Sequence, residues 1–200
     1  MQFQLLTIEF ILLQISVAFS PGLIIALVVN ESVQKGRKNG LQVAYGAATG
    51  AVGMTIITAL VITYVFTLIP EILTFIYVIG IVYIIFKGIK TLLDKGTVTT
   101  ALNSASFTSG LKINLANPKM WVFYLSVLPL FIEDETKIFS TLVFLGIFTI
   151  LINFFADISY ALLSSYLFNR SSLQVKRYIN VFSGICLISI GIYLFFSRFV

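Results

Sequence analysis

Long runs of apolar residues without a charge recur along the chain, and polar residues gather in the short stretches between them. The charge-free runs cover residues 10–30, 39–70, 72–86, 138–156 and 178–197, and the stretch 113–132 carries only Lys119. A helix needs about 20 mainly apolar residues to cross a bilayer. The pattern therefore predicts six membrane-spanning helices, near residues 6–30, 40–64, 70–92, 111–131, 139–167 and 178–198.

The composition excludes a soluble globular domain. Hydrophobic residues make up 58% of the chain and charged residues only 10%, whereas about a quarter of the residues of a typical soluble domain are charged. The longest connection, residues 94–110, is rich in threonine, serine and alanine, which is typical of a linker. We expect one all-α integral membrane domain over residues 1–200, with repeat one at about 1–93 and repeat two at about 111–200.

Two prolines with polar neighbours interrupt apolar runs at corresponding places in the two halves, in Ser20-Pro21-Gly22 and Asn117-Pro118-Lys119. A proline inside a helix removes a backbone donor and frees the carbonyl four residues earlier. Hydrocarbon cannot solvate such groups, so the breaks must face protein or a wet cavity. Matched broken helices usually form a substrate site near the middle of the bilayer. The alternative is a pair of packing kinks.

The third and sixth predicted helices resemble each other at one common offset, in the pairs Val78 and Val181, Gly80 and Ser183, Gly88 and Gly191, and Ile89 and Ile192. Three helices per half is an odd number, so the second half must enter the membrane in the opposite sense. The sequence therefore predicts two inverted three-helix repeats, with helices one and four broken at Pro21 and Pro118. Chance is the alternative, because glycine and proline are frequent in membrane helices.

Two buried charges are predicted inside the apolar runs. Lys119 is costly to insert, by about 2.5–3.5 kcal/mol, and so needs a partner or a wet cavity. Asp157 shares one face of the fifth helix with Asn153, Tyr160 and Ser164, and this face is expected to point into the bundle. Asp157 could carry a coupling proton, bind a substrate ammonium, or pair statically with Lys119.

The backbone beside the first break is a further candidate. A helix that starts after Gly22 would direct its positive dipole end toward an anion such as a carboxylate. The residues expected to line a substrate pathway are Ser20, Pro21, Gly22, Asn114, Asn117, Pro118, Lys119, Asn153, Asp157 and Tyr160.

The net charge of +5 and the pI near 9.4 do not indicate nucleic-acid binding, because the basic residues lie beside the ends of the predicted helices. Most fall in the first, third and fifth connections: Lys35, Arg37, Lys38, Lys87, Lys90, Lys95, Lys112, Arg170, Lys176 and Arg177. The opposite side has Lys137 and Arg198, with Glu9, Glu71, Glu133, Asp134 and Glu135. The positive-inside rule then predicts cytoplasmic odd-numbered connections and both chain ends outward.

Small residues form a surface on the second predicted helix, at Gly46, Gly50 and Gly53. Such a surface allows a close helix-to-helix contact. We expect a packing face, which could lie within the monomer or between two copies in a homodimer.

No cofactor or metal is expected. The chain has no histidine, which disfavours a transition-metal site, and its single cysteine, Cys186, excludes an internal disulfide. No serine–histidine, paired-carboxylate or thiol-redox arrangement is present, so an enzyme is disfavoured.

Motifs in both halves carry a family resemblance. Phe19-Ser20-Pro21-Gly22 is followed by the basic loop Gly36-Arg37-Lys38-Asn39-Gly40, and the second half holds Gly110-Leu111, Asn114-Leu115, Asn117-Pro118-Lys119, Phe123, Leu128-Pro129 and Phe131. At these residues the chain resembles the LysE/RhtB family of amino-acid exporters over nearly its whole length. The resemblance implies a six-helix protein of the bacterial inner (plasma) membrane that exports amino acids or related metabolites by proton antiport.

Two residues depart from the family pattern. Leu23 stands where the family has a second proline, which predicts a milder first break. Asn153 stands where many members have an acidic residue, and Asp157 follows one turn later. Efflux of another small solute or ion on the same scaffold is the alternative function, and a non-transporting membrane scaffold is another, although a scaffold would not need Lys119 and Asp157 buried.

Overall fold

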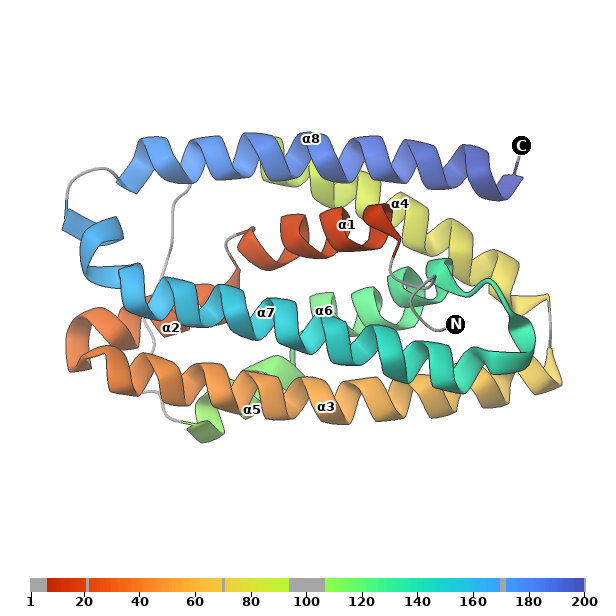
Figure 1. Ribbon diagram of the computed structural model, residues 1–200, viewed down its shortest axis with the longest axis horizontal. Coiled ribbons are helices and arrows are strands. Elements are labelled where there is room, and N and C mark those ends of the chain that lie inside the picture. Colours follow the sequence, from red (N-terminus) through yellow and green to blue (C-terminus); the bar gives the residue numbers. More distant parts are fainter. Residues whose placement is uncertain (1–6, 21, 70, 94–106, 170–171, 200) are drawn as a thin grey trace.

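The computed structural model describes residues 7–20, 22–69, 71–93, 107–169 and 172–199, and these residues are almost entirely helical (Figure 1). The α-helices are α1 (Ile8–Phe19), α2 (Leu23–Lys35), α3 (Arg37–Leu68), α4 (Ile72–Leu93), α5 (Phe107–Leu115), α6 (Pro118–Val122), α7 (Ile138–Asn169) and α8 (Ser172–Phe199). The tighter or wider turns are η2 (Phe123–Val127), η3 (Leu128–Phe131) and η4 (Glu135–Lys137). The described part of the chain contains no strand.

Four helices are each long and apolar enough to cross a membrane: α3, α4, α7 with η4, and α8. A fifth crossing results if α1 and α2, which bend by 49° at their break, form one span. The fourth predicted crossing is instead divided among α5, α6, η2 and η3. Together α6, η2 and η3 form an apolar helical segment, Pro118–Phe131, that is shorter than the four long helices. An all-helical membrane protein is therefore confirmed, while six spans in an inverted repeat stay a prediction. Because α5 begins at Phe107, the last residues of the predicted linker are helical.

The long helices lie side by side along the longest axis of the molecule (Figure 1). The main packed pairs are α3 with α7, α3 with α5, α4 with α8, and α2 with α3. The turn between α2 and α3 lies at one end of the bundle, together with the C-terminal end of α7 and the N-terminal end of α8. The turn from α3 to α4, the start of α7 and the Phe199 end of α8 lie at the other end.

The first helix break falls between Ser20 and Gly22. Helix α1 ends at Phe19, Ser20 has extended backbone, and α2 begins at Leu23 after an extended Gly22 with φ −151° and ψ −174°. Pro21 lies outside the described residues.

The second break is held by three local features. Asn117 has extended backbone, as expected before a proline, and its side chain accepts a 3.1 Å hydrogen bond from the Lys119 amide. Pro118 is the first residue of α6, where its missing amide costs nothing. The Trp121 indole donates to the Leu115 carbonyl at 2.7 Å and so satisfies one carbonyl at the end of α5.

Two apolar clusters lie on either side of the breaks. The larger cluster contains Phe10 and Leu13 of α1 and Leu142 of α7, which precede the polar residues of these helices in sequence. The smaller cluster contains Val28 of α2 and Ala161 of α7, which follow them. The breaks and their polar neighbours therefore form a layer between two apolar layers of the bundle.

The small-residue surface of α3 packs within the molecule. A β-carbon at Gly46 would collide with the Phe107 carbonyl of α5, and one at Gly50 would lie 3.3 Å from the Asn114 side chain. Gly110 of α5 approaches the Val43 carbonyl in return. The predicted packing face is confirmed for Gly46 and Gly50, whereas Gly53 faces open space.

Candidate functional site

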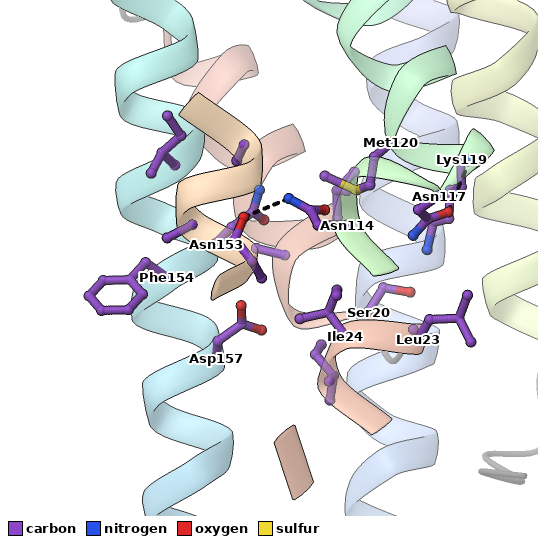
Figure 2. Close-up of a pocket in the computed structure, with 18 residues that line it drawn as sticks. Ser20, Leu23, Ile24, Asn114, Asn117, Lys119, Met120, Asn153, Phe154 and Asp157 are labelled. Carbon is purple, nitrogen blue, oxygen red and sulfur yellow. Dashed lines mark hydrogen bonds between the residues drawn. The ribbon is translucent and has the colours of Figure 1, made fainter. Parts of the chain in front are cut away.

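A pocket lies between the two helix breaks (Figure 2). Its polar lining consists of Ser20, Asn114, Asn117, Lys119, Asn153 and Asp157, and its apolar lining includes residues of α1, α2, α3, α6 and α7. Six of the ten predicted pathway residues thus supply all of this polar lining, and Gly22 also lines the pocket. Pro118 and Tyr160 are not among the lining residues, and Pro21 lies outside the described part of the chain.

Lys119 brings the second break into contact with the first. It occupies the first turn of α6, and a β-carbon built at Gly22 would lie only 3.3 Å from its Nζ atom. The absence of a side chain at Gly22 therefore spares the lysine head a tight contact. The Tyr83 hydroxyl of α4 donates to the Lys119 carbonyl at 3.3 Å and joins this turn to the neighbouring helix.

Asp157 approaches the pocket from α7. Its side chain is only 7% exposed, and Figure 2 shows the carboxylate on the opposite wall from Lys119. Among the described residues, no ion pair joins Asp157 to Lys119. The static pair that the sequence left open is therefore not formed in this structure.

A short hydrogen-bonded chain borders the pocket on the side of the larger apolar cluster. The buried Gln14 amide donates to Asn153 Oδ1 at 3.2 Å, and the Thr149 hydroxyl donates to Gln14 Oε1 at 3.4 Å. This chain ties α1 to α7 one turn before Asp157. It also satisfies the polar groups that the apolar surroundings would otherwise leave unpaired.

Two asparagines stabilise the backbone of the second break. Asn114 donates through Nδ2 to the Ala47 carbonyl at 2.6 Å, which fixes α5 against α3 (Figure 2). Asn117 caps α6, as described above. Both are buried, so they position the pocket wall in addition to lining it.

Tyr160 lies one turn beyond Asp157 and supports the first break. Its hydroxyl donates to the Phe19 carbonyl at 2.9 Å, which is freed where α1 ends. Asp157, Tyr160 and Ser164 are all buried, so the prediction that this stripe of α7 points into the bundle is confirmed.

The N-terminus of α2 supplies backbone donors. Its N-cap, Gly22, provides no side-chain hydrogen bond, and the first amides of a helix have no partner within it. Leu23, Ile24 and Ile25 line the pocket at this point. An anionic group in the pocket would therefore meet both these amides and the Lys119 ammonium.

Sequence reasoning missed four polar residues around the site, namely Gln14, Lys87, Thr91 and Thr149. Gln14 gave a usable signal, because it is a lone amide in an apolar run. Lys87 and Thr91 gave none, because each falls near the predicted end of a helix, where polar residues normally meet headgroups or water.

Apolar helices around a pocket with a polar lining define an integral membrane protein with an internal polar pocket. The chain matches the LysE type translocator family over residues 15–198 and therefore belongs to it. It is a transmembrane transporter of this family.

A relative is an uncharacterized membrane protein of Synechocystis sp., 28% identical over 187 residues, which cover 88% of this chain and 89% of that protein. No solved structure matches the chain significantly.

Proposed function

We propose that the protein is a secondary exporter that moves an amino acid or a closely related metabolite out of the cytoplasm in exchange for protons. The observation that carries this proposal is the pair of opposite charges, Lys119 and Asp157, on opposite walls of the pocket at the helix breaks. A zwitterion can place its carboxylate near Lys119 and the α2 amides, and its ammonium near Asp157.

The position of the pocket supports alternating access. The larger apolar cluster separates it from one end of the bundle, and the smaller cluster separates it from the other. A solute must open one apolar layer at a time to pass, which is the requirement for a coupled transporter.

Helix packing supports the inverted repeat on which such a cycle relies. A β-carbon at Gly88 of α4 would lie 2.7 Å from Ile188 Cγ1, and one at Gly191 of α8 would lie 2.6 Å from Ile85 Cγ1. Gly88 corresponds to Gly191, and Ile85 to Ile188, at the offset that relates the third and sixth predicted helices. A two-fold axis that exchanges α4 and α8 would place each glycine against the corresponding isoleucine of the other helix in this way.

The charge pattern supports an orientation in the bacterial inner membrane. The basic residues Lys35, Arg37 and Lys38 lie at the end of the bundle that holds the α2–α3 turn. We infer that this end is cytoplasmic and that the Phe199 end of α8 faces outward.

Asp157 is the proposed proton carrier. Tyr160 is its titratable neighbour on α7, and Lys119 is the cation across the pocket. A carboxylate without a fixed cation partner can exchange a proton for a substrate ammonium, since either one neutralises it.

The test measures efflux of radiolabelled amino acids from cells and their uptake into inside-out vesicles with an imposed pH gradient. We expect gradient-driven transport by the native protein. Asp157→Asn should retain substrate exchange but lose acceleration by the gradient. Asp134→Asn removes an exposed carboxylate that does not line the pocket and serves as the matched control.

Three outcomes are informative. Gradient-driven transport that is unchanged in Asp157→Asn would exclude Asp157 as the proton carrier. Transport that is insensitive to pH but follows another ion would replace the proton in the mechanism. Transport of no amino acid would exclude the proposed substrate and favour efflux of another small solute or ion.

A further inference from the structure

The pocket offers one positive and one negative side chain to a solute. Among the described residues that line it, Lys119 and Asp157 are the only charged ones. Lys87 and Lys90 of α4 lie within electrostatic range of Lys119 but do not line the pocket, so a solute there does not contact them. The carboxylate and ammonium of an amino acid therefore use both available charges. A charged side chain on the solute would lack a partner, which is costly in a poorly solvated site.

Asp157 indicates that a ligand enters this part of the pocket. The residue is 7% exposed, and its side chain forms neither an ion pair nor a hydrogen bond with a described residue. Figure 2 shows its carboxylate directed into the pocket. A buried carboxylate is costly unless a cation or a donor meets it. A solute ammonium meets this need, and the α-carbon of a bound amino acid then lies beside Asp157.

The amides nearest to Asp157 already have partners within the protein. Asn153 Oδ1 accepts the 3.2 Å hydrogen bond from Gln14, whose own Oε1 atom accepts from Thr149 at 3.4 Å. Asn114 donates through Nδ2 to the Ala47 carbonyl at 2.6 Å. These hydrogen bonds join α1 to α7 and α5 to α3. A polar side chain of the solute would have to compete with them.

Helices α3 and α7 are in contact on both sides of this part of the pocket. The rings of Tyr45 and Phe154 lie 5.0 Å apart between their centroids, and further along both helices a β-carbon at Gly146 would collide with Thr55. The two helices are therefore antiparallel, with a register that these contacts fix. Residues between the two contacts lie opposite each other across the pocket.

Alanines occupy that stretch of α3. Ala48 and Ala51 line the pocket, and Ile150 of α7 lines it from the opposite side. Glycines that serve close packing are covered by a neighbouring helix, as Gly46 and Gly50 are by α5, whereas these alanines border a cavity. Their short side chains leave space that a longer residue would fill. An apolar subsite thus adjoins the charged part of the pocket.

We propose that the pocket takes a neutral amino acid with an apolar side chain, which lies between Ala48 and Ala51 of α3 and Ile150 of α7. This proposal rests on the pocket being the transport site of the proposed exporter. The ammonium contacts Asp157, the carboxylate contacts Lys119 and the α2 amides, and the side chain contacts the apolar subsite. Each methylene buried there should raise the affinity about fourfold.

The test measures binding to the full-length purified protein in nanodiscs, from the thermal stabilisation that each ligand gives as its concentration rises. The ligands are glycine, L-valine, L-glutamine, L-glutamate and L-lysine. We expect valine to bind about tenfold or more tightly than each of the others. Isovalerate has the carboxylate and the side chain of valine but no ammonium, and it should also bind about tenfold more weakly than valine.

Two variants change the size of the subsite in opposite directions. Ala48→Val should fill it and lower the affinity for valine about tenfold, while glycine still binds. Ile150→Ala should enlarge it and raise the affinity for L-phenylalanine relative to valine, and this variant decides the matter if Ala48→Val does not fold. Ala116→Val is the matched control, because Ala116 is exposed in the turn between α5 and α6 and does not line the pocket.

Several results would overturn the proposal. They are valine binding no tighter than glycine, tighter binding of glutamine, glutamate or lysine than of valine, and binding of none of these ligands. Isovalerate binding as tightly as valine would assign the subsite to a fatty acid and would also overturn it. Ligand preferences that stay unchanged in both Ala48→Val and Ile150→Ala would exclude the wall between α3 and α7.

Transport in proteoliposomes separates this proposal from the proposed function. Valine binding without transport of any amino acid would contradict the exporter and leave the subsite standing. Gradient-driven transport of a polar or charged amino acid, but not of valine, would contradict the apolar subsite and leave the exporter standing.

Discussion

Gly22 is the residue that allows the two helix breaks to meet. Its backbone is extended, a conformation open to any residue, so its importance is not a matter of backbone strain. The missing side chain is what counts, because a β-carbon at Gly22 would lie 3.3 Å from the Lys119 Nζ atom, which is a tight contact. A methyl group added at Gly22 would displace the Lys119 side chain in the pocket, and we expect it to leave the helices unchanged.

Gly22→Ala should therefore reduce transport while leaving the fold intact. The new methyl group must move the Lys119 ammonium by a few tenths of an ångström, and we expect the KM for export to rise about three- to tenfold. Export kinetics in vesicles measure the effect. Gly53→Ala is the matched control, because a β-carbon at Gly53 meets nothing within 4 Å. An unchanged KM in Gly22→Ala would mean that Lys119 does not contact the substrate.

At the residue scale, the sequence predicted which charged residues are buried, but it did not predict which residues lie beside them. Lys119 and Asp157 were identified because a charge inside an apolar run is costly to insert and therefore indicates a functional site. That Lys87 lies beside Lys119 could not be predicted, because their proximity depends on how α4 packs against the second break. Apolar patterning gives the face of a helix but not its height relative to a neighbouring helix.

At the scale of elements, both breaks were predicted from proline, but the form of the second was not. After α6 the chain forms the wider turn η2, in which the Leu128 amide donates to the Phe123 carbonyl, and then the tighter turn η3. Pro129 explains the change, because it has no amide to donate to Leu125. Irregular turns of this kind compete closely in energy with a regular helix, and only the surrounding packing selects between them.

The crossing of α4 and α8 leads to a prediction about equivalent contacts. Gly88→Ala and Gly191→Ala should each destabilise the protein by about 1–3 kcal/mol, because each new methyl group would overlap an isoleucine of the opposite helix. Both variants should lose stability, and Gly88→Ala should lose more, because its β-carbon would also lie 3.0 Å from the Gly184 carbonyl oxygen, whereas the one at Gly191 would meet side chains alone. Unfolding in detergent measures them, with Gly53→Ala again as the control. A large loss at one glycine and none at the other would contradict equivalent packing.

At the scale of the whole molecule, the sequence predicted a helical membrane protein because length and apolarity alone identify α3, α4, α7 and α8 as crossings. It could not predict how the divided segments complete the bundle. Helices α1 and α2 each fall short of a crossing, as do α5 and α6. Helices α1, α2 and α5 are accommodated because they pack against the long neighbours α3 and α7, and α6 packs against η2. The pocket lies where these short segments meet, so the irregular part of the fold is also its polar part.

The arrangement of helix ends predicts which positions are accessible from each side of the membrane. The α3–α4 turn, the start of α7 and the Phe199 end of α8 lie at one end of the bundle, and the α2–α3 turn lies at the other (Figure 1). In sequence, Glu71 directly precedes α4, Glu135 is three residues before α7, and Lys38 is in the first turn of α3. In a Cys186→Ser background, cysteines introduced at residues 71 and 135 should react with an impermeant maleimide added outside intact cells. A cysteine at residue 38 should react only in inside-out vesicles, because the basic α2–α3 turn is retained in the cytoplasm. If residue 38 reacted from outside and residues 71 and 135 reacted only in inside-out vesicles, the orientation would be the reverse of the one proposed, while the fold would stand. Between residues 71 and 135 the chain crosses the membrane through α4 and returns through the second broken segment, so both residues should lie on the same side. Labelling of the two from opposite sides would therefore contradict the arrangement of helices in the bundle.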